Sequence, residues 1–98
     1  MKSDHSKWIN DDTDALLKAI LSLKNLSMAR KFFRDLLTEK ELLEFGQRWK
    51  VARLLAADVS YAEIERETGM SSTTIARIQS WRKNGMGGYR SMIKKTKV

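Results

Sequence analysis

Small hydroxyl side chains and one arginine gather in a short stretch of the second half of the chain. Residues 71–77 read Ser-Ser-Thr-Thr-Ile-Ala-Arg. On a helix, side chains three and four positions apart lie on one face. Short hydroxyls let a helix approach a groove closely, and arginine bonds to base edges or phosphates. The spacing therefore predicts a helix face suited to nucleic acid, made of Ser72, Thr73, Ala76, Arg77 and Ser80, with Thr74 near its edge.

These hydroxyls do not suit a catalytic site. Residues 68–98 contain no acid or histidine that could activate a serine or threonine as a nucleophile. The only histidine, His5, lies in a polar N-terminal segment. The chain has no cysteine, which excludes disulfides and thiolate metal sites. We therefore expect no enzyme activity, no catalytic residue, no metal and no cofactor.

A pair of helices must hold this face in place. Ser60 and Glu63 stand at the spacing of a capping box, which begins a short helix. Gly69 ends that helix, because glycine takes the left-handed conformation of a sharp turn without steric cost. A second helix then covers residues 71–84, with apolar contacts to the first expected from Ile64, Met70, Ile75 and Ile78. This layout is that of a helix-turn-helix, and a plain helical hairpin is the alternative.

Three further helices are predicted upstream, because apolar residues recur there at spacings of three and four. They cover residues 11–25, 27–37 and 38–58. Side chains that can accept from the first amides of a helix set the expected N-caps. These caps are Asp11 or Asp12, then Ser27, then Thr38 in a capping box with Glu41, and finally Ser71 or Ser72 for the helix that ends at Gly85.

The fold class expected from this pattern is all-α, with five to six helices in one domain over residues 1–98. A chain of 98 residues fits one domain, and the absence of proline suits helices. Within that domain we expect a disordered tail at 1–10, dimerisation and core helices at 11–58, the helix-turn-helix at 60–84, and a glycine-rich joint with a basic tail at 85–98. The last segment is either a short docked helix or a mobile arm.

The upstream helices carry more apolar surface than so short a chain can bury. Exposed apolar area of this kind commonly indicates self-association, and dimers with two-fold symmetry are the commonest result. We therefore expect a homodimer. The alternative is a compact monomer in which these stripes form the only core.

The charge of the chain is distributed unevenly. The formal net charge is +7, and no acidic residue follows Glu67. Seven basic residues follow Glu67, and they therefore account for the whole excess of positive charge. Such asymmetry favours a polyanion as partner, nucleic acid before an anionic membrane. The tail lysines Lys94, Lys95 and Lys97 are either a phosphate-binding arm or a solubility tail.

The sequence shows neither a signal peptide nor a membrane span. Residues 1–10 are polar and lack the apolar run of a signal peptide. No apolar stretch approaches the ~18 residues of a membrane span. We expect a cytoplasmic protein with no membrane partner.

The stretch Leu37 to Arg77 resembles the tryptophan-repressor family, over a little under half the chain. The resemblance rests on Leu37-Thr38, Gly46-x-Arg48, Ser60-x-x-Glu63, Gly69 and Thr74-Ile75-x-Arg77, in the family's order. It is closest to the Trp-repressor-like regulators rather than to the repressor itself. The resemblance implies an all-helical, intertwined homodimer in which the N-terminal helices of two chains interlock and the two recognition helices lie about one DNA turn apart.

The resemblance also implies a place for an effector. In the repressor family two arginines hold the tryptophan corepressor, and Arg48 and Arg77 stand at the equivalent positions here. The family's small residue beneath the indole corresponds to Ile78, and a serine near the ligand's amine corresponds to Trp81. We expect Trp81 or Ile78 to fill that space, so that tryptophan is not an effector. Arg48 alternatively pairs with Glu44 one turn earlier.

Together these features predict a sequence-specific, double-stranded DNA-binding transcriptional regulator. Phosphate contacts are expected from Ser71, Thr74, Arg82 and Lys83, and base contacts from Ser72, Thr73, Ala76 and Arg77. Two alternatives stay open. One is a repressor that responds to an amino acid or another metabolite through Arg48 and Arg77. The other is a protein–protein adaptor whose apolar helices bind a partner.

Overall fold

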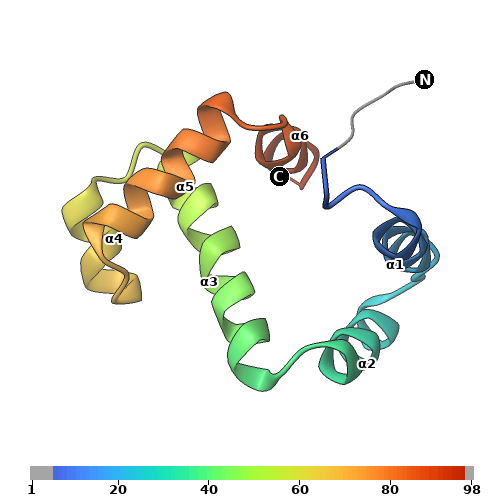
Figure 1. The fold of residues 1–98 in the computed structure, drawn as a ribbon. Coiled ribbons are helices and arrows are strands. Elements are labelled where there is room, and N and C mark those ends of the chain that lie inside the picture. Colours follow the sequence, from blue (N-terminus) through green and yellow to red (C-terminus); the bar gives the residue numbers. More distant parts are fainter. Residues whose placement is uncertain (1–5, 97–98) are drawn as a thin grey trace. The chain divides into compact units, whose positions relative to one another are not determined.

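The computed structural model describes residues 6–96 and shows six α-helices and no strand among them (Figure 1). The all-α fold class is therefore confirmed. The chain divides into two compact units, with the boundary between Glu39 and Lys40. The helices are α1 (Asp11–Leu21), α2 (Leu26–Leu36), α3 (Glu39–Ala56), α4 (Tyr61–Thr68), α5 (Ser72–Asn84) and α6 (Gly88–Thr96).

In the first unit, asparagines rather than the expected aspartates and serine cap the helices. Asn10 caps α1 and forms a reciprocal capping box with Thr13. Asn25, expected to end the first helix, instead caps α2 by accepting from the amide of Met28. The predicted caps Asp11, Asp12 and Ser27 are wrong by one or two positions, because asparagine accepts from the amide three residues on as well as serine or aspartate does. Helix α1 consequently ends at Leu21, before Asn25.

The part of the expected disordered tail before Ser6 lies outside the described residues. From Ser6 to Asn10 the chain forms a turn, closed by a hydrogen bond from the amide of Ile9 to the carbonyl of Ser6 at 3.1 Å. The Thr13 hydroxyl also donates to the carbonyl of Trp8 at 2.6 Å. This turn is thus tied to the start of α1.

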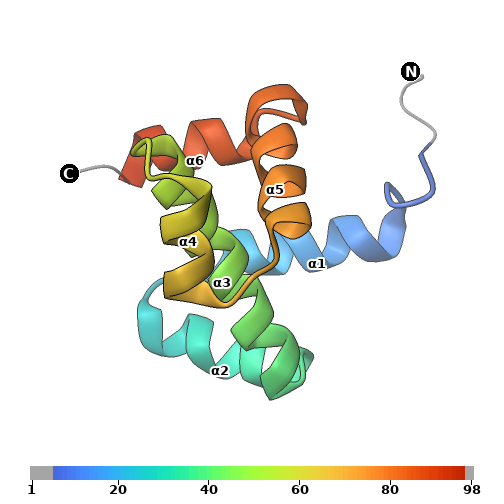
Figure 2. The same ribbon diagram turned by 90° about the vertical axis from the view of Figure 1, so that its left-hand side faces the viewer.

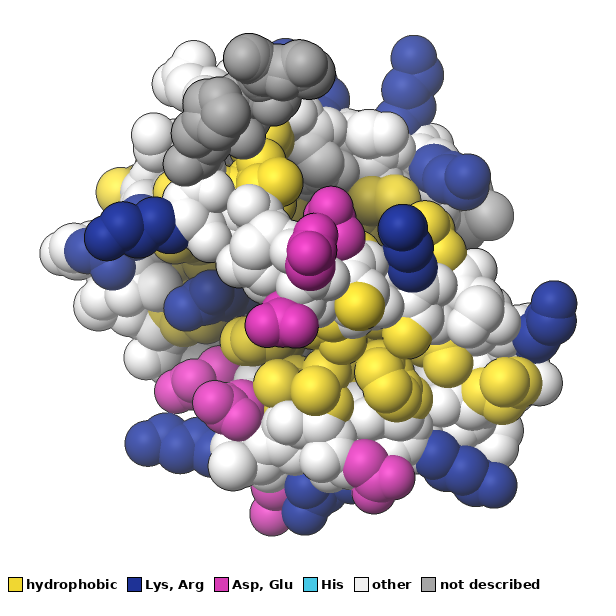
Figure 3. Space-filling view, turned by 45° about the vertical axis from the view of Figure 1, so that its right-hand side comes forward, with side chains coloured by type: hydrophobic (Ala, Val, Ile, Leu, Met, Phe, Trp, Pro, Cys, Tyr) yellow, Lys and Arg dark blue, Asp and Glu magenta, His cyan; other side chains and the backbone are white. Residues whose placement is uncertain are grey.

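None of the described residues of the first unit is buried. Among its exposed apolar side chains are Leu17, Leu21, Leu26, Met28 and Leu36, with Leu21 84% exposed. Figure 3 shows a band of hydrophobic side chains on one face of the molecule. The exposed apolar side chains of α1 and α2 named above are therefore left uncovered in a single chain.

The second unit contains the buried core of the chain. Fully or almost fully buried side chains come from α3, α4 and α5, and they are Val51, Ala52, Leu55, Ile64, Ile75 and Ile78. Helix α5 contacts both α4 and α6, and Figure 2 shows α4 and α5 side by side in front of α3. The expected contacts of Ile64, Ile75 and Ile78 are confirmed, and Met70 packs against the same core.

The C-terminal segment is a docked helix in the part that the structure describes. Tyr89 and Ile93 of α6 pack against the core, which decides between the two expected forms of this segment. Gly85 ends α5 with a negative φ of −83°, and a Cβ there would lie 2.5 Å from the carbonyl oxygen of Trp81. Glycine is therefore required at Gly85 by close approach of the backbone. Lys97 lies outside the described residues.

No helix among residues 6–96 is both long enough and apolar enough to span a membrane.

Candidate nucleic-acid interface

The turn between α4 and α5 has the geometry of a helix-turn-helix. Gly69 follows the last residue of α4 with φ +75°, the left-handed conformation that the sequence predicts. Its amide donates to the carbonyl of Glu65 at 2.8 Å. Thr68 closes the turn from the side, because its hydroxyl donates to the carbonyl of Ile64 and accepts from the amide of Met70. The direction of the chain into α5 is thus set by three local hydrogen bonds.

Ser71 is the residue that caps α5. Its hydroxyl accepts from the amide of Thr74 at 3.2 Å and lies 3.1 Å from the Thr74 hydroxyl. This leaves Ser72 and Thr73 in the first turn of the helix, where backbone amides have no partner within the helix. Such amides and the positive end of the helix dipole favour phosphate.

The predicted polar face of α5 is exposed. Its exposed members are Ser72, Thr73, Ala76, Arg77 and Ser80, while Thr74 is half-buried at the edge. The opposite face carries Ile75 and Ile78, which are fully buried. Burial of those two isoleucines therefore determines which face of α5 is turned outward. No acidic residue lies on α5.

Arg82 and Lys83 lie at the other end of α5. Both belong to its last turn, roughly 16 Å along the axis from Ser72 at the rise of an α-helix. The Arg82 Nε donates to the Gln79 side chain at 2.8 Å, and Arg82 is half-buried. The structure therefore does not bring these two cations together with the polar face at the start of the helix.

Helix α3 supports the turn from behind. The Gln47 side-chain amide donates to the carbonyl of Thr68 at 3.2 Å, and Lys50 Nζ lies 3.9 Å from Glu67. On α4, Glu63 is engaged with Arg66, and Ser60 caps the helix by accepting from the amide of Glu63. Two of the acidic side chains on α4 are thus matched by cations.

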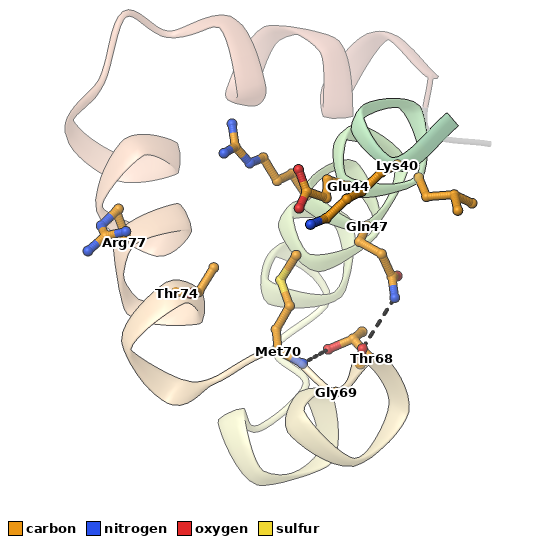
Figure 4. A pocket seen from close by; sticks show the side chains of 10 residues that line it. Lys40, Glu44, Gln47, Thr68, Gly69, Met70, Thr74 and Arg77 are labelled. Atoms are coloured by element: carbon orange, nitrogen blue, oxygen red, sulfur yellow. Dashed lines mark hydrogen bonds between the residues drawn. The ribbon is translucent and has the colours of Figure 1, made fainter. Parts of the chain in front are cut away.

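A cavity of about 490 Å³ opens between α3 and the helix-turn-helix. Its wall includes both arginines at the expected effector positions, Arg48 and Arg77. The full lining is Lys40, Leu43, Glu44, Gln47, Arg48, Thr68, Gly69, Met70, Thr74 and Arg77. Figure 4 shows the Arg77 side chain directed away from Lys40, Glu44 and Gln47. Arg77 therefore stands at the rim of the cavity and points outward.

Arg48 is held by aromatic rings. Its guanidinium carbon lies 5.9 Å from the ring centre of Phe45 and 6.0 Å from that of Trp81. The ion pairs among residues 6–96 do not include Arg48 and Glu44, so the expected pairing of these two side chains is not formed. Cation–π attraction acts at about this distance.

Neither of the two residues expected to fill the effector space lines the cavity beside Arg48 and Arg77. Ile78 is fully buried in the core. Trp81 instead lines a second, apolar cavity of about 500 Å³ with Trp49, Gly85, Met86, Gly88, Tyr89 and Met92. The Trp81 ring nevertheless lies beside the Arg48 guanidinium, so the expectation that Trp81 or Ile78 fills the effector space stays a prediction.

Sequence reasoning missed Lys40, Gln47 and the apolar cavity. Gln47 meets Thr68 across 21 positions of the sequence, and no local pattern encodes a contact of that length. The apolar cavity had a partial signal, because the spacing of Tyr89, Met92 and Ile93 indicated an apolar helix face. What the pattern lacked was the opposing face from Trp49 and Trp81.

Comparisons with known proteins give matches along nearly the whole chain. A family model described as Trp repressor protein matches residues 11–97. The uncharacterized protein YerC of Bacillus subtilis (strain 168) is 38% identical over 86 residues, which cover 88% of this chain and 83% of that protein. The crystal structure of a TrpR-like protein from Eubacterium eligens has a TM-score of 0.88 at 35% identity, covering 93% of this chain and 94% of that one.

Proposed function

Because this chain belongs to the Trp repressor protein family, we propose that it is a homodimeric transcriptional regulator that binds specific sequences of double-stranded DNA. The observation that carries the proposal is the start of α5. There, a serine-capped helix turns an exposed face of hydroxyls and Arg77 outward, with no acidic residue on the same helix. A helix of this type enters the major groove with its N-terminal residues at the base edges.

The two kinds of contact divide along α5. Base edges are read by Ser72, Thr73, Ala76 and Arg77, with arginine bonding to guanine as the commonest specific contact. Ser71 and Thr74 bind phosphates near the start of the helix. Ser80 lies on the same exposed face of α5 as the residues that read base edges. Arg82 and Lys83 reach only phosphates, because they lie in the last turn of the helix.

The homodimer is supported by apolar surfaces that one chain leaves uncovered. No residue from Ser6 to Glu39 is buried, and the second unit presents the apolar cavity around Trp49, Trp81 and Tyr89. Charge favours the same pairing: the first turn of α1 carries Asp11, Asp12 and Asp14, whereas α6 carries Arg90, Lys94 and Lys95. In the proposed dimer, the N-terminal helices of a second copy cover the apolar cavity of the first.

DNA binding in this proposal does not depend on tryptophan. A carboxylate between Arg48 and Arg77 requires both guanidinium groups to turn toward it. Arg77 points away from the cavity (Figure 4), and Arg48 lies at the rings of Phe45 and Trp81. Calorimetric titration with L-tryptophan should give no binding at micromolar concentration, and a micromolar dissociation constant would refute this part of the proposal.

The second candidate function is a repressor that responds to another small metabolite. It is favoured by the cavity itself, because Lys40 and Arg48 offer cations and Gln47 and Glu44 offer polar groups in its wall. Its ligand would carry an anionic group and a donor. DNA affinity measured with and without a panel of carboxylates and phosphate esters separates this candidate from an effector-independent regulator.

The test of DNA binding is selection of bound fragments from genomic DNA by the purified protein. We expect a shared sequence element in the selected fragments. Affinity for that element should fall steeply with salt, since each phosphate contact releases counterions. Equal affinity for selected and random duplexes would contradict sequence-specific binding. Absent or salt-independent binding would favour a protein–protein adaptor.

A further inference from the structure

The second half of α5 has no buried residue of its own. Ile75 and Ile78 anchor the first half of the helix in the core and are fully buried. From Gln79 to Asn84 every residue is exposed or half-buried. Helix α5 also contacts α4 and α6, but beyond Ile78 its own side chains reach α3 only at the edge of the core.

One contact at this edge is made by Arg48. Its guanidinium carbon lies 6.0 Å from the ring centre of Trp81 on α5 and 5.9 Å from that of Phe45, one turn earlier on α3. We call this three-residue contact the arginine bridge. Trp81 is 42% exposed. The bridge therefore joins α3 to the second half of α5 at the edge of the core rather than inside it.

We propose that the arginine bridge sets the angle of α5 on α3, and that Trp81 is a positioning residue for the recognition helix. The bridge uses only side chains of this chain, so it holds α5 in place without a small molecule. Trp81 acts through the orientation of α5, because it lies in the half of the helix remote from Ser72. The effect on DNA affinity rests on the DNA binding proposed above.

The test is a double-mutant cycle in DNA affinity on the selected fragment. Trp81→Leu keeps an apolar side chain but removes the ring face, and Arg48→Met removes the cation. Each should raise the dissociation constant about fivefold, the size expected of one partly exposed cation–π contact. The double variant should be no weaker than either single variant, and Trp81→Phe, which restores a ring, should stay within about twofold of the unchanged protein.

A matched control exists on α3 itself. The guanidinium carbon of Arg53 lies 5.9 Å from the ring centre of Trp49, but both residues belong to the same helix. Arg53→Met therefore removes one charge and one cation–π contact without touching α5. The DNA affinity of Arg53→Met should stay within about twofold of that of the unchanged protein, although this variant also loses one positive charge. A fivefold loss in this control, or additive losses from Arg48→Met and Trp81→Leu, would overturn the proposal.

The unchanged protein, Arg48→Met, Trp81→Leu and the double variant are also compared in urea unfolding without DNA. The midpoints should show the same non-additivity between Arg48→Met and Trp81→Leu, because the bridge exists in the free protein. If the unchanged protein binds no duplex at all, the proposed function fails and the unfolding cycle alone decides the bridge. Additive shifts in the midpoints would then show that Arg48 and Trp81 do not act together.

Discussion

The Gln47 side-chain amide donates to the carbonyl oxygen of Thr68 at 3.2 Å, which joins α3 to the last residue of α4. The final carbonyls of a helix have no partner within the helix. Gln47 supplies one, and Lys50, one turn later, lies 3.9 Å from Glu67. Helix α3 thus holds the end of α4 at the point where the chain turns into α5.

Removing this hydrogen bond should cost more stability than removing the neighbouring ion pair. Gln47→Leu leaves a half-buried carbonyl without its partner, a loss of about 1 kcal/mol in the free energy of unfolding. Lys50→Met removes a solvent-exposed ion pair worth only ~0.2–1 kcal/mol. Urea unfolding measures both. A larger loss for Lys50→Met would show that the contact of Gln47 does not support the turn.

Adding a methyl group should have opposite effects at two glycines. Gly69 has φ +75°, so Gly69→Ala strains the turn by about 1–2 kcal/mol although no atom lies within 4 Å of the new Cβ. Gly46 lies inside α3, also with nothing within 4 Å. Gly46→Ala should stabilise by roughly 0.5–1 kcal/mol through helix propensity. Thermal unfolding compares them, and destabilisation by both would mean that Gly46 has a packing role.

Two basic residues of α5 should differ in what they contribute to DNA binding. Arg77 stands on the exposed face near the helix start, and Lys83 in the last turn. Arg77→Ala should cost ~1–3 kcal/mol on the selected fragment and reduce discrimination against random DNA. Lys83→Ala should weaken binding to both DNAs about equally. Competition titrations with both duplexes measure this, and equal losses on both for each variant would refute the division.

Association of two chains should depend on the exposed leucines of α1. Leu21 is 84% exposed, so Leu21→Glu should hardly change the free energy of unfolding of a monomer. In a dimer it removes a buried leucine worth ~1.5–3 kcal/mol, which raises the dimer dissociation constant at least tenfold. Analytical ultracentrifugation measures the constant.

Ser27→Glu is the control for that experiment. Ser27 is an exposed polar residue near the start of α2, and its change adds the same charge without removing apolar surface. We expect it to leave association unchanged. A monomeric unchanged protein at micromolar concentration would contradict the homodimer directly.

Local sequence patterns correctly predicted those structural features that depend on a single turn of the chain. The capping serine Ser60, the left-handed Gly69 and the end of α5 at Asn84 all follow from side chains within three or four positions. The same rules placed the N-terminal caps wrongly, because Asn10 and Asn25 compete with neighbouring aspartates and a serine for the same amides. In the first unit, the patterns therefore predicted correctly that a helix begins in each region, but they did not predict the residue at which it begins.

The apolar contacts of α4 and α5 followed from periodicity, but the contacts of long polar and charged side chains between helices did not. The sequence alone determined an all-helical chain, the outward polar face from Ser72 to Ser80 and the family, because these depend on periodicity and motif. Only the tertiary structure decided that Arg48 meets Trp81 instead of Glu44, and that Arg77 points away from the cavity. The physical reason is that a long side chain selects among partners brought near by packing, and the burial of Ile75 and Ile78 determines which partners those are.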